Sequence, residues 1–123
     1  MLNLDTNILV FYVAGQLRRD EVKAMQDDPH WAVSGIVLWE LVKLAKKTRF
    51  DFQLSDPDVV EFLSRVQVLP ITMEIAETCG RLDFESDPAD QIISATSIVH
   101  RAPLLTRDSK LLASKVVPLA LRS

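Results

Sequence analysis

Short apolar segments alternate along this chain with longer segments of helical periodicity, and this alternation limits the folds available to it. The pattern predicts strands at Met1–Leu4, Trp31–Ser34, Val66–Pro70 and Pro103–Thr106, with a possible fifth at Val116–Leu119. Pro118 would place the fifth strand at an edge, because proline cannot donate to a sheet. Strands that alternate with helices predict an α/β fold with a parallel sheet, helices on both faces and right-handed crossovers.

The helical segments begin on recognisable start signals. Helices are predicted at Thr6–Val13, Arg18–Asp27, Ile36–Thr48, from Asp56-Pro57, from Thr72 to about Arg81, at Pro88–His100 and at Asp108–Ala113. An aspartate precedes a proline at positions 56–57 and again at 87–88. That order is typical of an N-cap followed by proline at the first helical position.

Length and composition indicate one soluble domain over residues 1–123. Apolar residues make up 48% of the chain and charged residues 25%, a balance typical of globular proteins. No apolar run approaches the ~20 residues that cross a bilayer, and the first residues lack the basic start of a signal peptide. The single cysteine, Cys79, predicts no internal disulfide. We therefore expect a cytoplasmic protein without membrane contact.

Four acids occupy positions that are unusual for surface residues. Asp5 directly follows the first predicted strand, and Asp108 follows the fourth in the sequence TRD. Glu40 lies in the helix after the second strand, and Asp90 lies at the start of the helix that leads to the fourth. Functional groups of parallel α/β folds gather at the carboxyl ends of the strands. The four acids are therefore candidates for one shared site.

Each acid also has a purely structural interpretation. Asp5 and Asp108 could cap the helices that follow them. Asp87 fits an N-cap better than a functional role, which places Asp90 at the third helical position, where an acid also favours the helix start. Glu40 is harder to explain in this way, because three of its four neighbours on the helix are apolar. A salt bridge to a nearby lysine is its structural alternative.

A shared divalent cation would explain the four acids together. Carboxylate oxygens suit hard cations such as Mg²⁺ or Mn²⁺. Such sites commonly serve phosphoryl chemistry, in which the metal neutralises phosphate charge and activates water. The net charge of −3 argues against binding a nucleic acid by surface charge alone, but bound cations would reverse the local charge.

The segments LDTNIL, SGIVLWELVKLAKK, SDPADQIISATS and LLTRDSKLL occur in the order seen in PIN-domain proteins. The chain most resembles the small VapC-type ribonuclease toxins of toxin–antitoxin pairs. The resemblance implies a three-layer α/β/α fold, with a parallel sheet of about five strands in the order 3-2-1-4-5. It also implies metal-dependent RNA cleavage, a small antitoxin that inserts a basic residue into the acidic site, and a homodimer.

The same resemblance assigns roles to individual residues. The metal-binding and catalytic acids would be Asp5, Glu40, Asp90 and Asp108. Thr6, Asn7 and Thr106 would support them by orienting acids or metal-bound water. The family often has a basic residue after the third acid and a histidine before it, where this chain has Gln91 and Glu85. These departures affect expected RNA contacts rather than the metal ligands.

Several other residues keep two interpretations. The basic run of Lys43, Lys46, Lys47 and Arg49 could contact RNA, or it could be a solvated helix end that complements the helix dipole. Trp31 and Trp39 are expected in the core or a dimer interface, with stacking on RNA as the alternative. His30 and His100 look exposed and are poor candidates for a general base.

Three rival functions remain open from sequence. A PIN-type nuclease could act in RNA or DNA processing instead of as a toxin. A PIN-like domain could also work as a non-catalytic interaction module, although the presence of all four acids argues against a degenerate site. A flavodoxin- or receiver-like regulator would need a suitably placed lysine, and the position of Glu40 does not fit that class.

Overall fold

A computed structural model describes residues 1–47 and 53–122 of the chain. Its sheet contains four parallel strands in the order β3-β2-β1-β4, which confirms that part of the predicted order. The strands are β1 (Leu2–Leu4), β2 (Trp31–Ser34), β3 (Val66–Leu69) and β4 (Leu104–Leu105). All four strands therefore have their carboxyl ends at the same edge of the sheet.

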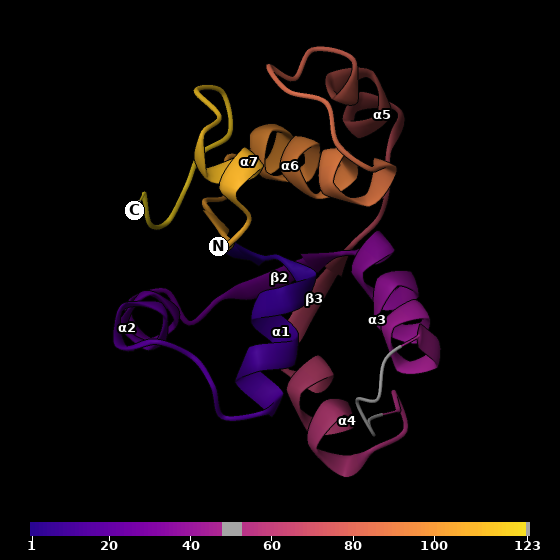
Figure 1. Ribbon diagram of the computed structural model, residues 1–123, viewed down its shortest axis with the longest axis vertical. Coiled ribbons are helices and arrows are strands. Elements are labelled where there is room, and N and C mark those ends of the chain that lie inside the picture. Colours follow the sequence, from indigo (N-terminus) through magenta and orange to yellow (C-terminus); the bar gives the residue numbers. More distant parts are fainter. Residues whose placement is uncertain (48–52, 123) are drawn as a thin grey trace.

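Seven helices connect and cover these strands within the described residues. They are α1 (Thr6–Val13), α2 (Arg19–Asp27), α3 (Gly35–Lys47), α4 (Pro57–Ser64), α5 (Met73–Cys79), α6 (Pro88–His100) and α7 (Ser109–Leu112). Figure 1 shows α5, α6 and α7 on one side of the sheet and α1 to α4 on the other. This arrangement is the predicted three-layer α/β/α architecture.

Local start signals place several helices as expected. The Asp87 side chain accepts the backbone N–H of Asp90 at 3.0 Å, and the Thr72 hydroxyl accepts that of Ile75 at 3.2 Å. The α5 helix ends at Cys79, two residues before its predicted end. Thr48 and Arg49, which the sequence places at the end of α3 and in the basic run, lie outside the described residues.

The middle residue of β1 fixes α6 over the sheet. Asn3 is fully buried, and its amide nitrogen donates to the Ile93 carbonyl at 3.2 Å and to the Ser97 hydroxyl at 2.9 Å. Because side chains alternate along a strand, Leu2 and Leu4 point to the opposite face of the sheet. The polar contact therefore sets the position of the helix that carries Asp90.

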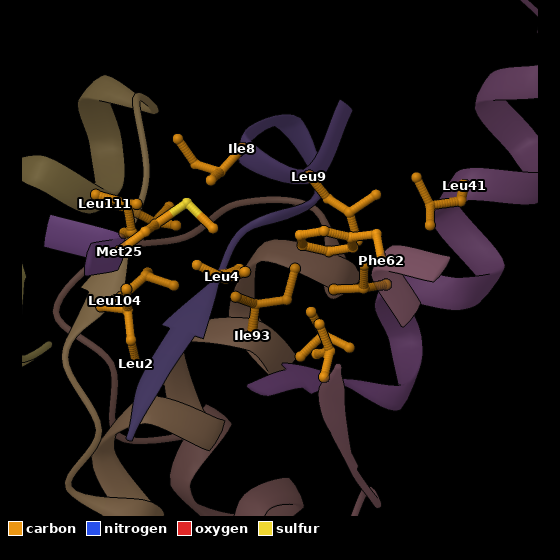
Figure 2. Packing of buried hydrophobic residues seen from close by; sticks show 14 of the residues in the cluster. Leu2, Leu4, Ile8, Leu9, Met25, Leu41, Phe62, Ile93, Leu104 and Leu111 are labelled. Carbon is orange, nitrogen blue, oxygen red and sulfur yellow. The ribbon is translucent and has the colours of Figure 1, made fainter. Parts of the chain in front are cut away.

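The hydrophobic core lies around β1 and draws residues from nearly every element. Within the described residues, every strand and every helix except α5 contributes buried side chains to it, and Figure 2 shows part of this packing. Leu4, Ile8, Ile93, Leu104 and Leu111 are all inaccessible to solvent. This packing anchors the strand ends and helix starts from which the acids project.

The expected fifth strand at Val116–Leu119 is reduced to a single parallel bridge between Leu104 and Leu119. The bridge lies beside β4, where the order 3-2-1-4-5 places it. Local partners take the backbone donors that a longer ladder would need: Ser114 Oγ accepts the N–H groups of both Val116 and Val117 at 3.2 Å. Pro118 has no N–H to contribute.

No helix within the described residues combines the length and apolar character needed to cross a membrane.

Candidate active site

Asp5 and Thr106 occupy equivalent positions at the ends of two adjacent strands. Leu4 of β1 pairs with Leu105 of β4 in a parallel register. The residues that follow them, Asp5 and Thr106, therefore lie side by side. The Thr106 hydroxyl donates to Asp5 Oδ2 at 2.6 Å, and the backbone N–H of Thr6 donates to Oδ1 at 2.8 Å. Asp5 is thus the N-cap residue of α1, yet one of its oxygens is held by the neighbouring strand.

Burial makes the Asp5 carboxyl a weaker acid than an ordinary aspartate. Only 4% of Asp5 is exposed. Desolvation is the largest cause that raises its pKa from 3.8 to about 6, and the charges of Asp90 and Glu40 act in the same direction. The hydrogen bonds from Thr106 and Thr6 oppose the rise. A carboxyl that costs this much to ionise is a candidate functional group.

Glu40 is half-buried on α3 and reaches the first residue of α1. On α3, Glu40 lies beside the buried face that Val37 and Leu41 form. The Thr6 hydroxyl donates to Glu40 Oε1 at 2.5 Å. Desolvation raises the pKa of Glu40, and the charge of Asp90 adds to the increase. The structure thus supports the interpretation in which Glu40 faces other acids, because none of the described salt bridges involves it.

Asp87 and Asp90 have different roles at the start of α6. Asp87 is the N-cap, as predicted, and it leaves the Asp90 side chain free for other contacts. Asp90 Oδ2 accepts a hydrogen bond from the Ser86 hydroxyl at 2.7 Å. Desolvation raises the pKa of Asp90, and the charges of Asp87 and Asp108 contribute further. Ser86 is a supporting residue that the sequence patterns did not identify.

Asp108 combines a structural contact with a place near the other acids. Its Oδ1 accepts the backbone N–H groups of Lys110 at 2.8 Å and Leu111 at 3.3 Å, so it caps α7. Its own N–H donates to Thr106 Oγ1 at 3.0 Å. Thr106 therefore links Asp108 to Asp5 through one hydroxyl.

The fold brings the four predicted acids into one electrostatically coupled group. The charge of Asp90 acts on Asp5 and Glu40, and the charge of Asp108 acts on Asp90. Hydroxyl or backbone N–H donors hold each carboxylate in place. Among residues 1–47 and 53–122, no three His, Cys, Asp or Glu side chains already form a cage for a metal ion.

The donor set nevertheless fits a hard divalent cation. All four candidate ligands offer carboxylate oxygens, and their mutual repulsion would fall when a cation binds between them. Three of the four have a raised pKa, so ionising them together is unfavourable without a counter-charge. A cation such as Mg²⁺ or Mn²⁺ would supply the charge that this group lacks.

The middle residue of TRD, Arg107, pairs with Glu21 on α2 and braces the loop. The Arg107 guanidinium donates from Nε and Nη2 to the two Glu21 carboxylate oxygens, each at 2.7 Å. It also donates to the Gln16 carbonyl at 3.1 Å and lies over the Phe11 ring at 3.8 Å from the centroid. This brace joins the loop of Thr106 and Asp108 to α2, and no spacing pattern predicts it.

None of the described hydrogen bonds or salt bridges joins the other residues singled out by the sequence to the four acids. Asn7 and His100 are exposed. His30 is also exposed and pairs with Gln67 at 2.9 Å. Trp31 belongs to the core periphery, where its Nε1 donates to the Met25 carbonyl at 2.9 Å. Lys46 and Lys47 lie exposed in the last turn of α3.

A parallel α/β domain with a coupled carboxylate group at its strand ends defines a class of candidate metal-dependent phosphoryl-transfer proteins. The PIN-domain family model matches residues 3–116. The chain therefore belongs to the PIN-domain family. Ribonuclease VapC22 of Mycobacterium tuberculosis is 33% identical over 116 residues, which cover 88% of this chain and 87% of that protein.

Solved structures of related proteins have the same fold. VapBC2 from Rickettsia felis, bound to a DNA fragment from its promoter, matches with a TM-score of 0.77 at 22% identity, over 97% of each chain. A toxin–antitoxin complex from Klebsiella pneumoniae matches with a TM-score of 0.68 at 29% identity, over 92% of this chain and 91% of that one. The match to Ribonuclease VapC22 confirms the resemblance to VapC-type proteins, and the solved structures show that the fold is shared.

Proposed function

We propose that this protein is a metal-dependent endoribonuclease and the toxin of a type II toxin–antitoxin pair. The observation that carries the proposal is the group of coupled carboxylates at the strand ends of a PIN domain. The similarity to a protein named as a VapC ribonuclease supports RNA as the substrate. The similarity to structures of toxin–antitoxin complexes supports the toxin role.

Asp5, Glu40, Asp90 and Asp108 are the proposed ligands of Mg²⁺ or Mn²⁺. When bound, the cation would neutralise phosphate charge and lower the pKa of a water molecule that attacks the phosphodiester. Thr106 and Thr6 orient Asp5 and Glu40 through the hydrogen bonds described above. Ser86 does the same for Asp90. The raised pKa values imply that cation binding releases protons.

The partner is proposed to be a small antitoxin that places a basic residue among these acids. The acids form none of the described salt bridges, so an arginine or lysine from outside could form charge-assisted hydrogen bonds there. By the same family resemblance, we propose that the toxin forms a homodimer. A competing cationic side chain would explain how the antitoxin blocks catalysis.

Nuclease activity tests the proposal directly. Purified protein should cleave single-stranded RNA in Mg²⁺ or Mn²⁺ and lose this activity in EDTA. Asp5→Asn should abolish cleavage, whereas Asp58→Asn, at an exposed position in the first turn of α4, should leave it unchanged. Cleavage that survives chelation, or an Asp5→Asn variant with full activity, would contradict the mechanism. DNA cleavage without RNA cleavage would favour the processing alternative.

Co-expression tests the partner. The product of the neighbouring reading frame should co-purify with the chain and inhibit RNA cleavage. An Arg or Lys to Ala substitution in that partner should restore cleavage without separating the complex. Expression of the chain alone without any harm to the host would argue against a toxin.

A further inference from the structure

A pocket of about 370 Å³ adjoins the acidic group. It lies between the first two turns of α3 and the start of α6, and its apolar lining consists of Ile36, Trp39, Pro88 and Ala89. Glu40 belongs both to this lining and to the acidic group. The pocket is therefore a direct extension of the proposed catalytic site, on a scale typical of small-molecule sites.

Trp39 is the most unusual component of the pocket. It is 53% exposed and lies beside Glu40 in the sequence. Trp31, the other tryptophan, is half-buried, stacks on Phe62 with ring centroids 5.8 Å apart, and donates its N–H to the Met25 carbonyl. Trp39 has no comparable role in the core. An exposed aromatic ring that lines a pocket beside an acidic site is a candidate binding surface.

The charged residues of the pocket are arranged around this ring. Lys43 Nζ lies 4.2 Å from the Trp39 ring centroid, one helical turn further along α3. Glu40 and Asp87 also line the pocket, and each has a carboxylate that can accept hydrogen bonds. The pocket thus offers an aromatic face, one cation and two acceptors.

We propose that this pocket binds the base of the nucleotide next to the cleaved phosphate. The base would stack on Trp39, the adjoining phosphate would lie near Lys43 and the acidic group, and Asp87 would accept a hydrogen bond from an amino group on the base. Because Glu40 and Asp87 each keep one carboxylate oxygen that accepts none of the described hydrogen bonds, bases with an exocyclic amino group should bind better than uracil. This inference rests on the proposed ribonuclease function and adds a determinant of its substrate specificity.

Base binding is measurable without cleavage. The four nucleoside monophosphates, in Mg²⁺, should quench the tryptophan fluorescence of the wild-type protein, and UMP should bind most weakly. Ribose 5-phosphate, which has the phosphate but no base, should cause no quenching. Trp39→Phe should remove the nucleotide-dependent signal, since Trp31 is engaged in the core. Equal quenching by ribose 5-phosphate, or an unchanged signal in Trp39→Phe, would overturn the proposal.

Cleavage kinetics provide the second measurement. Trp39→Ala should lower kcat/KM for RNA by roughly 5- to 150-fold, the range expected for the loss of one base stack, mainly through KM. Trp39→Phe should retain most of the activity. Val60→Ala, which removes an apolar side chain 52% exposed on α4, is the matched control and should have no effect. Asp87→Asn should reduce the difference in binding between uracil and the bases that carry an exocyclic amino group.

The results separate this proposal from the general function. RNA cleavage that is unaffected by Trp39→Ala would refute the base pocket and leave the ribonuclease intact. A change in oligomeric state with unchanged cleavage would show that Trp39 covers a protein interface instead, and would also refute the pocket. A wild-type protein that never cleaves RNA would refute the proposed function, while base-dependent quenching would still support a nucleotide pocket.

Discussion

The Thr106 hydroxyl donates a hydrogen bond of 2.6 Å to Asp5 Oδ2, joining two residues that are 101 positions apart in the sequence. The same hydroxyl accepts the backbone N–H of Asp108 at 3.0 Å. It therefore links two of the proposed ligands at the ends of adjacent parallel strands. This contact opposes the effect of burial on the pKa of Asp5.

Thr106→Val should make Asp5 harder to ionise. Loss of the hydroxyl raises the pKa of Asp5 above its value of about 6, and leaves the Asp108 N–H without its partner. Metal-free stability should fall by about 1 to 2 kcal/mol. Mn²⁺-induced thermal stabilisation should shift to higher pH, since cation binding requires the ionised acid. Thr106→Ser is the control, and an unchanged pH profile in the valine variant would contradict the assigned role.

Asp5 should make the metal-free fold less stable as the pH rises. Its pKa is higher in the folded chain than the ordinary 3.8, so the folded state holds the proton more tightly. The favourable contribution is complete below about pH 4 and is lost between pH 4 and 6, a change of roughly 3 kcal/mol for the shift to about 6. Urea unfolding from pH 4 to 7 should show this change as a difference between wild type and Asp5→Asn. Parallel profiles for the two proteins would disprove it.

Substitutions of Asp90 and Asp87 should change the metal-free stability of the fold in opposite directions. Asp90→Asn removes a charge that raises the pKa of both Asp5 and Glu40, so it should raise the melting temperature in EDTA and abolish cleavage. Wild type should gain about 2.7 kcal/mol from Mn²⁺ at a hundredfold excess over its dissociation constant, and Asp90→Asn should gain much less.

The matched control for that experiment is Asp87→Ala. It removes the N-cap bond to the Asp90 N–H and should cost about 1 kcal/mol, yet the variant should still respond to Mn²⁺. If Asp90→Asn melts lower than wild type in EDTA and wild type gains nothing from Mn²⁺, Asp90 serves only the helix start.

Arg107→Ala should destabilise the fold by about 3 kcal/mol, the lower end of the range for breaking a buried ion pair, because Arg107 itself is 19% exposed. Glu21 is left buried without its cation. The Arg107 hydrogen bond lowers the pKa of Glu21, so the wild-type pair stabilises at neutral pH and loses this contribution as the pH falls through the lowered pKa. The Arg107→Ala deficit, measured by urea unfolding, should therefore shrink at acidic pH. A deficit independent of pH would show that packing on Phe11 dominates.

Local sequence determined most of the secondary structure and the placement of each acid on its element. The N-cap bonds of Asp87 and Thr72 span three residues, and such contacts form within a single turn. The family segments also identified the four candidate acids. The fifth strand is where this reasoning went too far, because strand propensity at Val116–Leu119 does not reveal that Ser114 takes two of the backbone N–H groups.

Tertiary structure alone decided which groups meet. Thr106 reaches Asp5 because β1 and β4 pair in a parallel register, and Arg107 reaches Glu21 across 86 positions because the loop after β4 packs against α2. Glu40 is half-buried and coupled to Asp90 because α3 packs against α6. Desolvation depends on all the chain segments that cover a group. The pKa of Asp5 is therefore raised only in the folded protein.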